Sequence, residues 1–124
     1  MSPALALLIA AVIRVESGGD TSAIGHHGEV GCLQIRPVVI EDVNRFQNAV
    51  RFTLEDRYNH GRSVAIFRIY VAHYATDARL GREPTIEDMA RIWNGGPNGW
   101  RKASTARYWR KVLAELQKNR SGPP

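Results

Sequence analysis

Apolar side chains recur along this chain at helical spacing. In the first stretch they fall at i, i+3, i+4, i+7 and i+8, which places them on one face of a helix. Three later stretches repeat the pattern, and the first of these predicts a central helix that runs to about Leu80, where Gly81 ends it. The four stripes are Leu5, Leu8, Ile9, Val12 and Ile13; Val64, Phe67, Val71, Tyr74 and Ala78; Ile86, Met89, Ala90 and Trp93; and Tyr108, Val112 and Leu116. Since no segment alternates with the period of two typical of strands, the pattern predicts an all-α fold of about six helices.

Small and polar residues predict the loops between these helices. Residues 17–31 are rich in glycine and small polar side chains, and 94–99 form a second such stretch. Pro37 should begin a short helix. That helix would turn Val39, Ile40 and Val43 inward.

Two threonines have the sequence context of helix N-caps. Thr53 and Thr85 are each followed by acidic residues in what would be the first helical turn. The last helix should begin near Ser104, and the tail 121–124 is predicted to fray.

Glu16 interrupts the first apolar stripe. It falls eleven residues after Leu5, on the face predicted to be buried and at the carboxyl end of the helix. Burial and the negative end of the helix dipole both oppose ionisation of a carboxylate there. Because breaks in local rules tend to mark function, Glu16 is a candidate acid with a raised pKa. The plainer interpretation is a carboxylate that turns outward or pairs with Arg14.

Length and composition limit the fold and its chemistry. The 124 residues are 44% apolar and 23% charged, so we expect residues 1–124 to form a single globular domain. Cys32 is the one cysteine and is interpreted as a small buried apolar residue. The four histidines show no metal-ligand spacing, so no metal or other cofactor is predicted, and His26 and His27 are expected as an exposed loop pair.

The net charge of +5 is concentrated at one end of the chain. Residues 1–99 carry ten arginines and eleven acidic residues, whereas 100–124 carry seven basic residues and Glu115 as the one acid. Such a segment suits an anionic wall polymer, an anionic membrane or nucleic acid, and charge does not choose among them. The apolar start of the chain has no positive leading region or cleavage site and is too short to span a bilayer, so neither a signal peptide nor a transmembrane segment is predicted.

Four blocks along the chain resemble the lytic transglycosylase and goose-type lysozyme superfamily, including its phage-type lysins. The first is the Glu16-Ser17 pair ending a helix, and the second is the turn Gly31-Cys-Leu-Gln-Ile35. The third is Ile92-Trp-Asn-Gly-Gly-Pro97, followed by Thr105-Ala-Arg-Tyr108 with Val112. The resemblance implies a lysozyme-like fold with a loop-lined active-site cleft. It also implies cleavage of the β-1,4 bond between N-acetylmuramic acid and N-acetylglucosamine in peptidoglycan.

The resemblance also assigns roles to five residues. Glu16 is the implied catalytic acid, and Ser17 is a neighbour that helps hold it. Gln34 and Asn94 are implied substrate contacts, since a side-chain amide can donate to and accept from an N-acetyl group. Ordinary turn chemistry is the alternative for both. Tyr108 is implied beside the glutamate, with its ring in the core.

The sequence departs from goose-type lysozymes at their aspartates. The two matching positions are Gly25 and Arg36. An inverting hydrolase needs a second carboxylate to hold water, whereas a lytic transglycosylase uses the substrate's own hydroxyl and N-acetyl group. We therefore expect the transglycosylase route, with a 1,6-anhydro product. The alternative is hydrolysis by a water held by Asp20 or Glu29.

Other classes of function fit the sequence less well. A cysteine peptidase would need Cys32 beside a histidine, and nothing pairs them. The mixture of Trp100, Trp109 and basic residues also suits nucleic acid, and a wall-binding module without catalysis is a further alternative. We expect glycan strands of peptidoglycan as the partner, no nucleic acid, and a monomer. Action on the extracytoplasmic wall would then follow release by cell lysis or through a pore.

Overall fold

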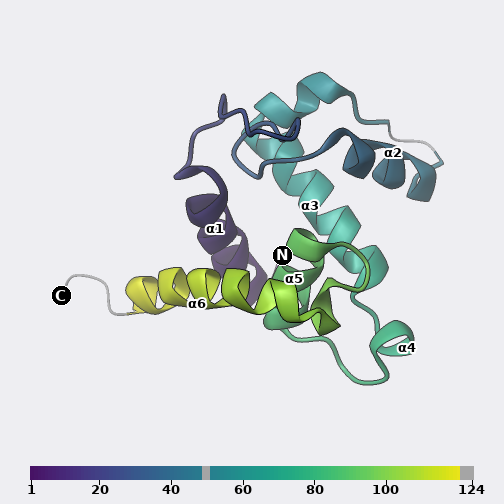
Figure 1. Ribbon diagram of the computed structural model, residues 1–124. Coiled ribbons are helices and arrows are strands. Elements are labelled where there is room, and N and C mark those ends of the chain that lie inside the picture. Colours follow the sequence, from purple (N-terminus) through teal and green to yellow (C-terminus); the bar gives the residue numbers. More distant parts are fainter. Residues whose placement is uncertain (49–50, 121–124) are drawn as a thin grey trace. The chain divides into compact units, whose positions relative to one another are not determined.

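The computed structural model describes residues 1–48 and 51–120, so the tail expected at 121–124 lies outside the described residues. Helices dominate that part of the chain (Figure 1). The α-helices are α1 (Pro3–Ser17), α2 (Pro37–Phe46), α3 (His60–Tyr74), α4 (Asp77–Leu80), α5 (Ile86–Gly95) and α6 (Ala106–Arg120). The 3-10 helices are η1 (Leu54–Tyr58), η2 (Gly99–Arg101) and η3 (Ala103–Thr105). Within the described residues the only β-type pairing is two isolated bridges, which confirms the all-α prediction.

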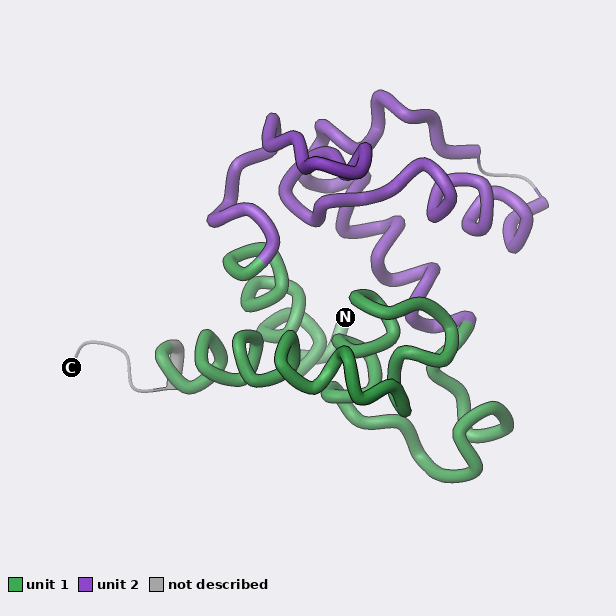
Figure 2. Tube along the Cα trace, viewed as in Figure 1, with its two compact units in different colours: residues 1–15, 74–124 green, residues 16–73 purple. Residues whose placement is uncertain are grey.

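The chain divides into two compact units (Figure 2). Unit 1 contains residues 1–15 and the chain from Tyr74 onward, and unit 2 is Glu16–His73. In unit 1 the buried apolar side chains come from α1, α4, α5 and α6, and α5 packs against η2, η3 and α6. In unit 2 they come from the 30–35 turn, α2, Phe52 and α3.

The first stripe and the short helix after Pro37 are confirmed. Leu8, Ile9, Val12 and Ile13 are buried in α1, and Leu5 is half-buried. In α2 the buried side chains are Ile40 and Val43, with Val39 half-buried. Both predicted threonine caps are present as capping boxes, Thr53 with Asp56 and Thr85 with Asp88, although Thr53 begins a 3-10 helix.

The predicted central helix to Leu80 is wrong in its second half. The α-helix ends at Tyr74, and Thr76 adopts an extended conformation and caps α4 by accepting a hydrogen bond from the Arg79 amide. Because Thr76 starts a new helix, Ala78 leaves the stripe and is exposed. Gly81 does end α4, in the left-handed conformation at φ 75°.

The buried face of α5 also differs from the prediction. Ile86, Met89 and Trp93 are half-buried, so Trp93 does not complete a core stripe. The buried side chains are Ala90, Ile92 and the charged Asp88. In α6, Val112 is buried and Tyr108 and Leu116 are half-buried, while Arg107, Arg110, Lys111 and Lys118 are exposed as expected. Among the described helices, none is long and apolar enough to cross a membrane.

Candidate functional site

The predicted site residues belong to two different parts of the fold. Glu16, Ser17 and Gln34 lie in unit 2, and Asn94 and Tyr108 lie in unit 1 (Figure 2). Glu16 is half-buried in the last turn of α1. Tyr108 is half-buried in the first turns of α6.

Ser17 ties the end of α1 to the turn that follows the first loop. Its Oγ donates a hydrogen bond to the Cys32 carbonyl oxygen at 2.8 Å and accepts one from the Gly19 amide at 3.1 Å. Both contacts fix the helix end next to Glu16. The predicted role of Ser17, to hold its neighbour, is therefore compatible with its contacts.

Gln34 uses its side-chain nitrogen to close this turn. Its Nε2 donates to the carbonyl oxygens of Ala23 at 3.2 Å and Gly31 at 3.0 Å. Its backbone has φ 50°, a left-handed conformation that is uncommon for residues other than glycine. The side-chain hydrogen bonds offset that strain. These contacts are the turn chemistry that was the alternative to sugar binding. They do not involve the side-chain oxygen Oε1, which lies against Gly25.

Two carboxylates lie in the same loop, and both are held ionised. Hydrogen bonds from the backbone and hydroxyl of Ser22 hold the pKa of Asp20 below its ordinary value. The backbone amide of His27, at 2.8 Å from Oε1, is the largest influence that lowers the pKa of Glu29. Asp20 is exposed, whereas the Glu29 side chain is 17% exposed and its Oε2 lies 3.7 Å from Arg36 Nη2.

Arg57 of η1 is a buried cation that binds backbone carbonyl groups of this loop. It is 7% exposed, and its Nη1 donates to the carbonyl oxygens of Gly28 at 2.9 Å and Ile35 at 3.0 Å. Its Nε donates to the Leu54 carbonyl oxygen at 3.0 Å. A single guanidinium therefore joins both ends of the 28–35 segment to η1.

The cysteine has the character predicted for it. Cys32 is fully buried, and this burial raises the pKa of its thiol. A thiol with a raised pKa is a poor nucleophile, because the thiolate is the reactive form. His26 and His27 are exposed, as expected for a loop pair.

Asn94 differs from Gln34 in its surroundings. It is exposed near the end of α5, and within residues 1–48 and 51–120 no hydrogen bond of its side-chain amide is found. Both tryptophans near this loop are half-buried. The Trp100 ring has the guanidinium carbons of Arg82 and Arg101 at 5.7 and 5.4 Å from its centre, within the range of cation–π attraction.

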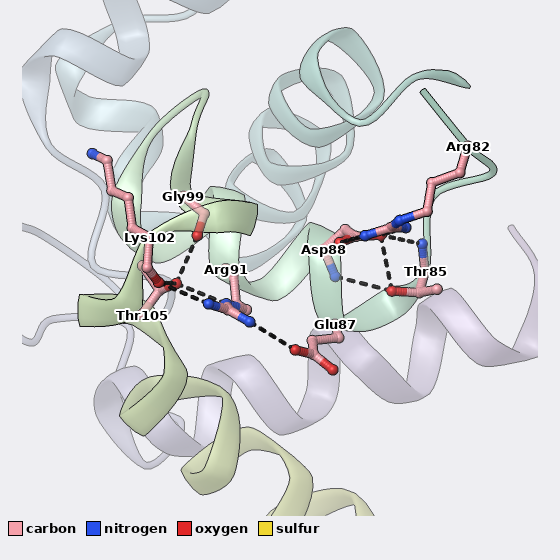
Figure 3. A network of polar contacts seen from close by, with 8 residues as sticks. All are labelled: Arg82, Thr85, Glu87, Asp88, Arg91, Gly99, Lys102 and Thr105. Atoms are coloured by element: carbon pink, nitrogen blue, oxygen red, sulfur yellow. Dashed lines mark hydrogen bonds and ion pairs between the residues drawn. The ribbon is translucent and has the colours of Figure 1, made fainter. Parts of the chain in front are cut away.

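A polar network connects α5 to the segment that follows it (Figure 3). Arg91 Nε donates to Thr105 Oγ1 at 2.8 Å, and its Nη2 donates to the Lys102 carbonyl oxygen at 2.7 Å. Its Nη1 forms an ion pair with Glu87 at 2.8 Å. Thr105 is 2% exposed, and its hydroxyl donates to the Gly99 carbonyl oxygen at 2.6 Å.

Asp88 anchors the start of α5 in the same view (Figure 3). Its carboxylate accepts two hydrogen bonds from Arg82, at 2.7 and 2.9 Å, and two from Thr85. Burial, the largest influence, raises its pKa, but the hydrogen bonds from Arg82 and Thr85 together hold the pKa below the ordinary value. Asp88 is therefore an ionised carboxylate that fixes the helix end.

The residues that hold the two loops are absent from the candidates taken from the sequence. Arg57, Arg79 and Arg91 bind several backbone carbonyl groups, which a sequence pattern does not show. One signal was available. Thr76-Asp77 has the same form as the threonine caps at Thr53 and Thr85, and it marks the start of the helix that carries Arg79.

The chain has relatives among known proteins. No protein-family model matches it. It is similar to a lysozyme of Magallana gigas, with 34% identity over 106 residues that cover 82% of this chain and 72% of the relative. It is also similar to Lysozyme 1 of Crassostrea virginica, with 46% identity over 46 residues, 37% of this chain. In that second match the chain spans 24% of the relative's length.

These matches agree with one part of the expected resemblance. Both relatives are lysozymes, and neither bears on lytic transglycosylases or on the goose type. The prediction of a lysozyme-type enzyme is therefore confirmed at the level of the family. Identity of 34% over most of both proteins shows common descent, and the chain belongs to the lysozyme family.

Proposed function

We propose that this protein cleaves the β-1,4 bond between N-acetylmuramic acid and N-acetylglucosamine in peptidoglycan, with Glu16 as the general acid. One observation carries the proposal. In a chain of the lysozyme family, Glu16 is a half-buried carboxyl group at the carboxyl end of a helix. Such a position opposes ionisation, so Glu16 suits a group that must deliver a proton near neutral pH.

The first step transfers the Glu16 proton to the glycosidic oxygen. The carbon–oxygen bond then breaks, the leaving sugar departs as an alcohol, and positive charge develops on the muramic acid ring. Ser17 acts as a positioning residue in this step, because it fixes the end of α1 through Cys32 and Gly19. The proton donor therefore sits on a helix end that is held in place.

For the second step, we infer that a water attacks rather than the substrate's own hydroxyl group. Glu29 is held ionised by the His27 amide, and its other oxygen, Oε2, lies 3.7 Å from Arg36 Nη2. Oε2 would orient a water and take its proton as the water oxygen bonds to the muramic acid ring carbon. Glu29 suits this role better than Asp20, because its side chain is 17% exposed whereas Asp20 is exposed. The relatives are lysozymes, which supports the same choice. The transglycosylase route expected from the sequence rests only on the absence of the two goose-type aspartates.

The partner in this proposal is a glycan strand of the extracytoplasmic wall, bound by a monomer. Asn94 offers a free amide to an N-acetyl group, and Gln34 shapes the turn rather than donating to sugar. The four exposed cations of α6 supply an attraction to an anionic wall polymer that salt would screen. They do not favour nucleic acid, since Tyr108 and Trp109 on this helix are half-buried.

The test compares Glu16→Gln with Glu41→Gln, which changes an exposed glutamate on α2. Purified cell walls are digested, turbidity is followed, and the released muropeptides are identified by mass spectrometry. Glu16→Gln should lose at least about a hundredfold in rate, because it removes general acid catalysis. The Glu41→Gln control should match the parent.

The chemical ends of the products then distinguish the two routes. Reducing ends, together with a large loss of rate in Glu29→Gln, support hydrolysis. Anhydro ends would restore the transglycosylase route and remove the role given to Glu29. Undiminished lysis by Glu16→Gln would exclude Glu16 as the acid.

A further inference from the structure

We propose that Arg79, Lys102 and Thr105 are positioning residues that hold the Gly95–Gly99 loop, and with it the end of α5, rigid, so that the amide of Asn94 in the last turn of α5 is presented to an acetamido group of the glycan. This inference rests on the proposed function and extends it. It assigns a role to three residues that do not themselves touch the sugar.

The backbone carbonyl groups of the loop are all engaged. Three of the five are bound by side chains from outside the loop, two of them being Gly95 by Lys102 Nζ at 2.7 Å and Pro97 by Arg79 Nη1 at 2.9 Å. The Gly99 carbonyl oxygen accepts from the Thr105 hydroxyl at 2.6 Å. The remaining two, of Gly96 and Asn98, accept from the backbone amides of Gly99 and Arg101. Because the last carbonyl groups of a helix normally lack partners, this complete set is a specific feature of the loop.

Thr105 is the buried centre of the arrangement (Figure 3). Its hydroxyl accepts from Arg91 Nε at 2.8 Å while it donates to Gly99. It therefore links α5, from which the loop starts, to the loop's far end. One hydroxyl group therefore connects an arginine of α5 to the last residue of the loop.

Arg79, which lies on α4, also holds the loop. Its Nη1 also donates to the Tyr74 carbonyl oxygen at 2.7 Å, and its Nη2 donates to Asn98 Oδ1 at 3.2 Å. The break after Tyr74 and the cap at Thr76 place this arginine where it reaches the loop. Arg79 is exposed, so its removal should loosen the loop without opening a core.

Asn94 is the group that benefits from this rigidity. Its amide has a donor and an acceptor, and an acetamido group has the complementary pair, so two hydrogen bonds can form side by side. Lys102 binds the carbonyl group of the next residue, Gly95, and a helix end that is already held in this way loses less conformational entropy on binding. The chemistry points to an N-acetylated sugar rather than to a charged ligand.

The experiment is a double-mutant cycle with Arg79→Ala, Asn94→Ala and both together. Binding of triacetylchitotriose is measured by calorimetry, and KM and kcat are measured on purified walls. Arg68→Ala is the matched control, because Arg68 is an exposed arginine on α3. Hydrogen exchange at the Gly96 and Gly99 amides reports the order of the loop.

If Arg79 acts through Asn94, its loss should weaken binding about fivefold, with KM raised and kcat nearly unchanged. Asn94→Ala should weaken binding about tenfold, and the double variant should be no weaker than Asn94→Ala alone. Exchange at Gly96 and Gly99 should be faster in Arg79→Ala and unchanged in Arg68→Ala. Thr105→Ser should bind like the parent, and Thr105→Val should not.

Additive losses in the double variant, or unchanged exchange, would overturn the inference. Parent-like binding by Arg79→Ala would do the same. In each of these cases the proposed function survives as long as Glu16→Gln is inactive and the parent cleaves walls. A parent that neither binds the trisaccharide nor cleaves walls would overturn both.

Discussion

The two loops that carry the candidate polar residues are held in different ways. In unit 2 the side chains of Gln34 and Glu29 bond to the backbone of their own loop, and Arg57 of η1 binds the same loop from outside. In unit 1 the Gly95–Gly99 loop is held by side chains from α4 and from the segment after it. The amide of Gln34 is engaged, whereas no hydrogen bond of the Asn94 amide is found in the described part of the chain.

This difference separates two amides that looked alike in the sequence. Each is part of a glycine-rich turn, and each could bind sugar or backbone. The partners that hold the loop decide between these roles. In the unit 2 loop, the Gln34 amide itself closes the turn. In the 95–99 loop, side chains from outside the loop bind three of the five carbonyl groups, so the Asn94 amide is not needed for this purpose.

Arg57 is the one large outside support of the unit 2 loop, and its removal should have the largest effect on stability. Arg57→Met keeps much of the volume but removes the bonds to three buried or half-buried carbonyl groups, of which that of Ile35 keeps the Val30 amide as a donor. We expect a loss of about 3 kcal/mol in the free energy of unfolding, measured by urea denaturation. Arg68→Met should lose almost nothing. Similar losses in the two variants would mean that Gln34 and Ser17 suffice to hold the loop.

Asp88 anchors the helix from which the unit 1 loop starts, so Asp88→Asn should destabilise by about 2 kcal/mol at pH 7. The pKa of Asp88 in the folded protein lies below its ordinary value of 3.8. Its contribution is therefore complete well above pH 3.8 and is lost as the pH falls through the folded pKa. Urea denaturation of both proteins between pH 7 and pH 2.5 measures this difference. A difference that stays constant down to pH 2.5 would contradict the assignment.

The smallest expected effects on stability come from removing each of the two side-chain amides in turn. Gln34→Ala removes two hydrogen bonds to backbone and should cost about 1–2 kcal/mol. Asn94→Ala should change stability by less than about 0.5 kcal/mol, because the residue is exposed and its amide is unengaged. Thermal unfolding of the two variants measures both. Equal losses would remove the distinction between the loops.

Periodicity predicted most of the fold because burial repeats with the helical turn. The stripes of α1, α2 and α6 and the caps at Thr53 and Thr85 follow from local rules alone. The break after Tyr74 was missed because the apolar spacing continues through it, although Thr76-Asp77 carries the signal of a new helix. The burial of Asp88 was missed because it depends on the Arg82 side chain, which lies six residues away.

The residue types of the candidate site come from the sequence, whereas the partners of these side chains come from the structure. Glu16 and Asn94 stand out in the sequence through position and motif. The engagement of Gln34 depends on the carbonyl groups of Ala23 and Gly31, whose direction no sequence pattern fixes. The arginines that support the loops cannot be identified from the sequence for the same reason, since every residue type has a backbone carbonyl group.

Two glycines have a consequence for how this sequence can diverge. At Gly31 the carbonyl oxygen of Arg57 occupies the place of a β-carbon, and at Gly99 the carbonyl oxygen of Arg91 does so. Neither neighbour is a flexible side chain that could move aside. Other residues near these two positions can be substituted, but a side chain at either glycine would require the backbone to move. They are the fixed points from which a remote relative of this chain could be aligned.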